Sequence, residues 1–285
     1  MIIEAPPLTA PRRSGLFVAA NGPMPLEQHA ETTGAQWWSN ACGGSKLYPP
    51  ACSDAPYTAF DEGAASGLED AFPVVVYSSI KCPPVGKSLE RAREDARARL
   101  EASEEAAVES AFWGGQTTPV AIPGILERLS LQGGSNMVLI AGTAANVKEA
   151  TSKLEQQSAA STYYGPTILH FRPAAAAYMG GAGLLKSRVS TDGEHQFTHY
   201  GSEVVFGQGY SGSSPDNVTA PDSTTEYGAV TGRVFIWRSE VFFQDQGASA
   251  EPGLNKTTNQ RTVIAWRVYA VGVECFAAMI KFTRA

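Results

Sequence analysis

Small and apolar residues recur every three or four positions between residues 88 and 113, and this spacing predicts a long helix. Ser88 can cap the first free amides of that helix, and Gly114 and Gly115 mark its end. At 1.5 Å per residue the helix would be roughly 39 Å long. Its narrow stripe of small side chains would let another backbone approach closely. The stripe consists of Leu89, Ala92, Ala96, Leu100, Ser103, Ala107 and Ala111.

Apolar and β-branched runs predict strands before and after this helix. The run FPVVVYSSI directly precedes it, at residues 72–80. Strand and helix patterns then alternate, which is typical of a small α/β layer. The alternating segments are 137–141, 144–160, 166–171 and a helix that starts at Pro173. Three long strands are predicted at 233–243, 262–274 and 275–282, and the second is apolar on both faces apart from Arg267.

Two segments lack a clear periodic spacing of apolar and polar residues. Residues 1–70 are rich in proline and cannot easily form their own core, yet they hold six aromatic side chains, which predicts an arm that packs on something else. These aromatics are Phe17, Trp37, Trp38, Tyr48, Tyr57 and Phe60. Residues 186–232 are rich in Ser, Thr, Asp and Gly, and apart from one strand at 203–206 we expect long surface loops there.

Composition narrows the class of protein. The chain has 285 residues, enough for one large or two modest domains, and its 28 glycines and 18 prolines favour strands, turns and extended arms. A net charge of −6 with no basic run longer than Arg12-Arg13 argues against a general nucleic-acid binder. Neither a secretory signal nor a membrane-spanning apolar run is present, so we expect a soluble protein made in the cytosol. The four cysteines are expected to be free, mostly buried thiols.

Three motifs approach known chemistry without completing it. Gly86-Lys87-Ser88 stands where a P-loop would place its GK[ST], but Lys81 replaces the first glycine and Pro83 and Pro84 carry no amide to hold phosphate. The run 209–213, GYSGS, resembles a nucleophile elbow around Ser211, but it lacks the last glycine and a following helix.

His195 and His199 are the third case. With Asp192 and Glu194 they leave a weak cation site conceivable, although two imidazoles do not make a site. The sequence therefore predicts no catalytic, cofactor-binding or metal-binding residue. A P-loop-like or hydrolase enzyme stays as the rival from the enzyme class.

The charges of the predicted helix are uneven. Its first half mixes arginines with acids, whereas its second half carries Glu101, Glu104, Glu105 and Glu109 with no basic residue, at the end where the helix dipole is already negative. We hypothesise that basic groups from another segment or subunit meet this acidic end. A solvated acidic face remains the equal alternative.

The order of these parts resembles the major capsid protein of tailed bacteriophages, which has the Hong Kong 97 fold. The similar local features are the long helix ending in AFWGG and four short segments. Those segments are ILHFRP at 168–173, VVFGQGYSG at 204–212, YGAVTGRV at 227–234 and RTVIAWRVYAVG at 261–272. Together they span roughly residues 72–285.

The resemblance implies an α+β architecture with five parts. Residues 1–45 would form an N-terminal arm and 46–86 an extended loop region. Residues 87–135 would form the spine helix and a segment of the peripheral domain, and 136–232 mainly the axial domain. Residues 233–285 would supply terminal strands that return to the peripheral domain.

The resemblance also implies a structural function without cofactors. Identical subunits would form hexamers and pentamers of an icosahedral shell that encloses double-stranded DNA without sequence-specific binding or a membrane, in a virion assembled in the bacterial cytoplasm. Scaffolding, portal and decoration proteins would be separate partners. An encapsulin-type nanocompartment shell and a phage decoration or tail protein are the structural rivals. The candidate interface residues are Trp37, Trp38, Tyr48, Glu101, Glu105 and Glu109.

Overall fold

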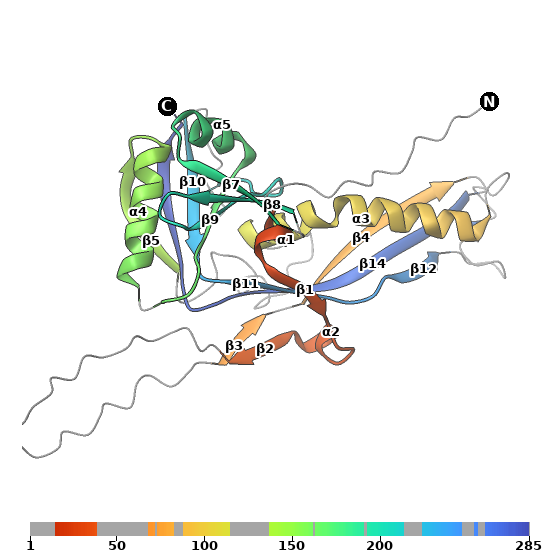
Figure 1. Ribbon diagram of the computed structural model, residues 1–285. Coiled ribbons are helices and arrows are strands. Elements are labelled where there is room, and N and C mark those ends of the chain that lie inside the picture. The colour runs from red at the N-terminus through yellow and green to blue at the C-terminus, as the bar shows by residue number, and fades with distance from the viewer. Residues whose placement is uncertain are drawn as a thin grey trace, which may run out of the picture.

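The chain forms a mixed α/β structure built on two large sheets. The computed structural model describes residues 15–38, 68–71, 73–82, 88–114, 137–161, 163–190, 193–213, 224–246, 254–255 and 260–284. A six-stranded sheet, a seven-stranded sheet and a two-stranded ribbon are present in these ranges. Figure 1 shows an elongated part, in which α3 lies along β4 and β14, joined to a more compact part that holds α4, α5, β5 and β10.

Helix α3, Leu89–Gly114, is the long helix that the sequence predicts. The Ser88 hydroxyl accepts a hydrogen bond from the Arg91 amide at 3.1 Å, so the predicted cap is confirmed. The helix packs on one face of the six-stranded sheet. The side chains at their contact form one core, which includes Ala92, Ala96, Leu100, Val76, Ile80 and Val263.

Strand β14, Gln260–Val273, is the centre of the six-stranded sheet. Strand β4, Pro73–Cys82, pairs with it antiparallel along one side. On the other side lie β12, Phe242–Gln246, β13, Leu254–Asn255, and β11, Val234–Arg238. Strand β1, Asn21–Pro25, joins β11 in parallel. Because β4 alternates strictly between buried and exposed residues, one of its faces meets α3 and the other is open.

The seven-stranded sheet contains the predicted α/β layer. Its strands run in the order β5, β15, β10, β6, β9, β8, β7. Helices α4, Val147–Ala160, and α5, Pro173–Gly181, share a core with this sheet that includes Leu154, Met179, Phe171 and Phe282. The strand bounds are Met137–Ala144, Ala277–Thr283, Thr225–Thr231, Ile168–Phe171, Glu203–Phe206, Gly193–Thr198 and Leu185–Ser190, in the same order.

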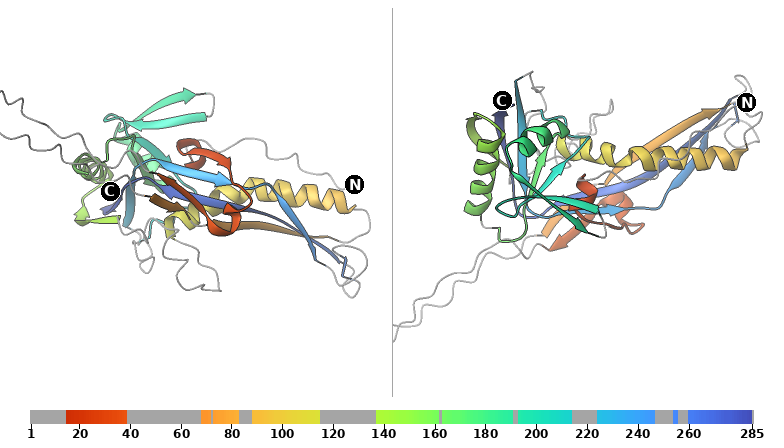
Figure 2. Two further views of the ribbon diagram at one scale, coloured as in Figure 1. Left: turned by 90° about the horizontal axis from the view of Figure 1, so that it is seen from below. Right: turned by 45° about the horizontal axis from the view of Figure 1, so that its top comes forward.

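The expectation of long loops is wrong for residues 186–190, 193–198 and 225–231, which form strands. Strands β7 and β8 form a hairpin that stands out from the body, as the left view in Figure 2 shows, and β10 lies inside the sheet. Five of the six residues of β7 are exposed, so no alternation of polar and apolar residues marks that strand. In β10, Gly228 packs under the ring of Phe171, where a Cβ would lie 2.4 Å from the ring.

The terminal strands divide between the two sheets, whereas the resemblance implies that all of them return to the peripheral domain. Strands β11 and β14 lie in the six-stranded sheet, whereas β15 pairs with β10 in the other. The turn of Glu274, Cys275 and Phe276 redirects the chain, with Cys275 at a φ of 66°. Gly232 lies against this turn, and a Cβ on it would approach the Glu274 carbonyl oxygen to 2.2 Å.

The described part of the N-terminal region packs mainly on the six-stranded sheet. It contains α1, Leu16–Ala19, α2, Ala30–Thr33, and β2, Ala35–Trp38, which pairs with β3, Leu68–Ala71. Helix α1 also contacts β8 and β9 of the seven-stranded sheet. The predicted arm therefore contacts its own subunit over residues 15–38.

The two described cysteines differ in oxidation state. Cys82 is a buried free thiol, as expected, but Cys275 is disulfide-bonded, so the prediction of free thiols is wrong for that residue. Within the described ranges, no helix has the length and apolar character needed to cross a membrane.

Candidate assembly surface

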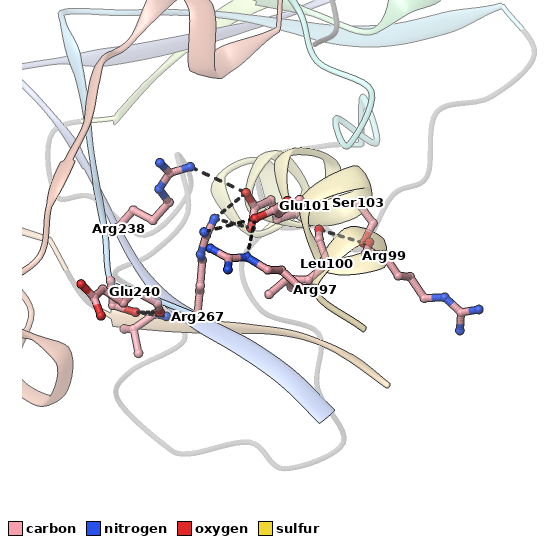
Figure 3. A network of polar contacts seen from close by, with 11 residues as sticks. Arg97, Arg99, Leu100, Glu101, Ser103, Arg238, Glu240 and Arg267 are labelled. Carbon is pink, nitrogen blue, oxygen red and sulfur yellow. Dashed lines mark hydrogen bonds and ion pairs between the residues drawn. The ribbon is translucent and has the colours of Figure 1, made fainter. Parts of the chain in front are cut away.

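The acidic half of α3 meets basic groups from two strands of the same chain. Arg267 of β14 donates from Nη1 to both carboxylate oxygens of Glu104, at 2.9 and 3.1 Å, and its Nη2 lies 3.6 Å from Glu101. Arg238 of β11 lies 3.8 Å from Glu104, and Arg97 donates to Glu101 at 3.1 Å. Figure 3 shows Arg97, Glu101, Arg238 and Arg267 converging between the helix and the sheet. The hypothesis of a basic partner segment is thus confirmed within the subunit for Glu101 and Glu104.

Glu109 joins three separate segments. Its two carboxylate oxygens accept hydrogen bonds from the Leu16 and Gly209 amides, each at 2.9 Å. The side chain is buried because the 207–212 loop closes over this part of α3. A Cβ on Gly209 would lie 2.1 Å from the Ala106 carbonyl oxygen, so only glycine allows so close an approach. Both oxygens of Glu109 are therefore used inside the subunit.

Glu105 lies one helical turn before Glu109 and is half-buried. Its carboxylate is next to Gly15, where a Cβ would lie 2.0 Å from Oε1. Glu101 is the most exposed of the three predicted acids, with 46% of its side chain accessible. Of these three, Glu101 is the one that the fold leaves on the surface.

Trp37 holds the N-terminal segment on the six-stranded sheet. Its ring lies 5.2 Å from Trp237 and 5.8 Å from Phe235 between centroids, and it covers Gly272 so closely that a Cβ there would be 2.1 Å from the indole. Such a contact buries a large apolar surface. Trp38 pairs with Leu68 through the backbone, while its side chain and all of Tyr48 lie outside the described residues.

A partly exposed aromatic row crosses the open face of the six-stranded sheet. Tyr77 of β4 and Phe242 of β12 both stand opposite Trp266 of β14, and antiparallel partners share a face. Phe242 stacks on Trp266 with centroids 4.5 Å apart, and Tyr77 is 67% exposed. The sequence did not single out these residues, although the alternation along β4 marks Tyr77 as belonging to one face.

His170 is the centre of a buried, neutral network behind the end of α3. Its Nδ1 lies 2.9 Å from the Tyr210 hydroxyl and its Nε2 lies 2.8 Å from the Thr231 hydroxyl. Because Thr231 donates its own proton to the Gly232 carbonyl, we assign the ring proton to Nε2 and let Nδ1 accept from Tyr210. Burial lowers the pKa of His170 to about 3 and raises the pKa of Tyr210.

The described residues of the motifs that approach known chemistry make ordinary structural contacts. Gly86 and Lys87 lie outside the described residues, and Ser88 caps α3. Ser211 is exposed, and its hydroxyl lies 2.6 Å from that of Ser213. His195 lies 2.5 Å from Glu203, whereas His199 lies 2.9 Å from the Gly183 carbonyl oxygen. The two histidines therefore face different partners.

Comparisons with known proteins reveal similarity in structure but not in sequence. No protein-family model and no curated protein matches the chain. A solved chain of Mycobacterium phage Cain is similar with a TM-score of 0.53 and 11% identity, over 98% of this chain and 94% of that one.

Two further solved structures are similar to the chain over its whole length. A chain of Mycobacterium phage Bobi is similar with a TM-score of 0.50 and 15% identity, over 100% of this chain and 96% of the other. The capsid of an empty GTA particle gives a TM-score of 0.51 and 14% identity, over 100% and 95%. At such identities the likeness concerns the fold. The predicted resemblance to phage capsid proteins is confirmed at that level: the chain has the fold of a phage-type capsid subunit.

Proposed function

We propose that this chain is the major capsid protein of a tailed bacteriophage, a subunit of an icosahedral shell around double-stranded DNA. The observation that carries the proposal is the likeness to the capsid of the GTA particle, which extends over the whole of this chain and nearly the whole of the other. A match of that extent includes both sheets and α3, rather than one common motif. The function is mechanical, and we assign it no catalytic step.

The parts of the subunit then take the roles that the resemblance implies. Helix α3, within residues 87–135, is the spine helix and packs on the peripheral-domain sheet, while most of 136–232 forms the axial domain. Residues 1–45 are the N-terminal arm, and 46–86 form the extended loop region. Strands β11 to β14 belong to the peripheral domain, and we move β15 to the axial domain because it pairs with β10.

The contacts around α3 support a stiff building block. Glu104 with Arg267, and Glu109 with the Leu16 and Gly209 amides, fix the helix to β14, to the N-terminal segment and to the 207–212 loop. These buried bonds hold one subunit together. We keep Trp38, Tyr48 and Glu101 as residues that contact neighbouring subunits, in hexamers and pentamers of the same chain.

The remaining assignments follow from this role. The subunit resides in the virion after assembly in the host cytoplasm, with separate scaffolding, portal and decoration proteins as partners. Its net charge of −6 suits a container that encloses DNA without binding it tightly.

Electron microscopy of particles made from this chain tests the proposal. The chain is produced with its neighbouring phage proteins, particles are purified, and their content is measured after nuclease treatment. We expect closed shells with hexameric and pentameric units that protect double-stranded DNA. Shells that enclose a protein cargo instead would identify an encapsulin-type compartment. Monomers alone, in every buffer and with the partner proteins present, would refute a shell function.

A further inference from the structure

A groove of about 540 Å³ lies where β1, β11 and the first half of α3 meet. One wall is formed by Pro23, Met24 and Pro25 of β1. The rest is lined by Arg97, Arg238, Ser239, Glu240, Val241 and Arg267. Three of these nine residues are arginines, and they come from a helix and two strands that are far apart in the sequence. Figure 3 shows the three guanidinium groups close together.

The positive charge of this cluster is only partly neutralised. Glu101 and Glu104 pair with the three arginines from the helix side, so within these ion pairs three guanidinium groups share two carboxylates. The third acid of the groove, Glu240, lies at its edge. Arg97 and Arg238 keep 54% and 37% of their side chains exposed, which leaves their remaining donors available on the groove side. An anion entering the groove would meet donors that are already positioned.

One donor of the Arg267 guanidinium group is not used within the described part of the subunit. The residue is 7% exposed and borders the groove, yet among the described residues its Nε finds no hydrogen-bond acceptor. Its Nη1 is fully engaged with Glu104. A buried guanidinium donor without an acceptor is unfavourable, and a small movement of the Arg267 side chain toward an oxygen in the groove would relieve this cost.

We propose that this groove is a binding site for an oxyanion, either a phosphate or a carboxylate group. Arg97 and Arg238 hold the anion, and Arg267, which also lines the groove, adds a third positive charge. Planar guanidinium groups bind such oxygens through two parallel hydrogen bonds, which lysine does not. The source is either free phosphate or a carboxylate of a second copy of the chain. The site does not depend on the proposed function.

Glu240 makes the proposal sharply testable. This acid is exposed at the edge of the groove and forms no ion pair with any described residue, so its charge opposes an incoming anion. Glu240→Gln should therefore tighten anion binding without removing any bond that the fold needs. Arg238→Gln and Arg97→Gln should weaken it. Arg99→Gln is the matched control, because Arg99 donates to the Ser79 carbonyl instead.

The experiment is a calorimetric titration of the full-length dispersed chain with inorganic phosphate at constant ionic strength. We expect saturable binding, about tenfold weaker in Arg238→Gln, as expected for loss of one charge-assisted hydrogen bond, and several-fold tighter in Glu240→Gln. Arg99→Gln should bind like the parent. Circular dichroism checks that each variant is folded. No binding to the parent chain, or equal affinity in the Arg238 and Glu240 variants, would overturn the proposal.

A second arm identifies the source of the anion. Assembled particles are titrated in the same way. Phosphate binding to the dispersed chain but not to particles would show that a carboxylate of a second copy fills the groove after assembly. Binding to both forms would identify free phosphate as the ligand. If no particles form, the proposed shell function fails, while the titration of the dispersed chain still decides the groove.

Discussion

Arg233 and Glu274 form a two-point ion pair where the chain passes between the sheets: Nε donates to one carboxylate oxygen at 2.7 Å and Nη2 to the other at 3.1 Å. The Tyr163 hydroxyl accepts from the Arg233 amide at 3.0 Å and donates to the Pro166 carbonyl at 2.9 Å. Beside the pair, the Glu274 amide donates to the Arg233 carbonyl at 2.9 Å. Side-chain and backbone bonds thus fix the same crossing point.

Glu274→Gln should weaken this crossing point. The amide keeps the shape of the side chain but loses its charge, and because the side chain of Arg233 is 38% exposed, water compensates part of the loss. We expect the free energy of unfolding to fall by about 1–2 kcal/mol. Urea denaturation of the dispersed subunit measures it, with Lys148→Gln on the exposed face of α4 as the control. An unchanged free energy would mean that the backbone bonds alone hold the crossing.

The Glu104 and Arg267 pair should show strong coupling. Glu104→Gln leaves the buried guanidinium group of Arg267 with only the more distant Glu101 as an anion, which costs about 3–5 kcal/mol of unfolding free energy. The double variant Glu104→Gln with Arg267→Met should lose less than the sum of the two single variants, and a double-mutant cycle gives the difference. The exposed pair Arg97 and Glu101 is the comparison, with a coupling below about 1 kcal/mol. Additive effects at Glu104 and Arg267 would contradict the observed pairing.

Two glycine substitutions should have opposite effects. In Gly209→Ala the new methyl group meets backbone atoms of α3, 2.1 Å from the Ala106 oxygen and 2.5 Å from the Ser110 nitrogen, so the loop must move away. Nothing lies within 4 Å of a Cβ at Gly180 in α5, so Gly180→Ala should stabilise the subunit by about 0.5–1 kcal/mol through helix propensity. Thermal unfolding should show a lower midpoint for the first variant and a higher one for the second. Similar midpoints would argue against the close packing of the 207–212 loop.

Acid should destabilise the subunit partly through His170. Its pKa falls from 6.5 to about 3 on burial, so between these values the unfolded chain binds a proton that the folded chain does not. Stability from this group is therefore complete above pH 6.5 and declines as the pH falls toward 3. His170→Gln should lose less unfolding free energy between pH 7 and pH 4.5 than the parent does. The exposed His199→Gln should follow the parent, and an identical decline in all three proteins would exclude His170 as the cause.

The sequence predicts the ends of α3 but not all of its buried face. The cap at Ser88 and the glycines after residue 113 are local signals. The buried row, however, continues from Leu100 to Glu104 and Val108, whereas the predicted Ser103 and Ala107 are exposed. A glutamate in a core position is recognisable only with its partner Arg267, 163 residues away, which local patterns do not reveal.

Contacts between distant segments also explain the other differences between the sequence predictions and the structure. The position of Glu109 depends on amides at Leu16 and Gly209, from opposite ends of the sequence relative to α3. Strand β7 is exposed at nearly every residue and exists because β8 pairs with it, so its polar sequence looks like a loop. By contrast, β9 and α5 carry strong local signals, and the sequence predicts the bounds of β9 and the start of α5.

The passage of two chain segments between the sheets has a mechanical consequence. Strand β10 continues into β11 and, beside it, β14 continues into β15, with the two segments antiparallel and hydrogen-bonded on both sides of the turn. Tension along the length of the molecule is therefore borne by two covalent backbones in parallel. For one segment to slide past the other, many ladder bonds must break at once in shear, rather than one after another as in peeling. A subunit built in this way resists stretching where its two halves join.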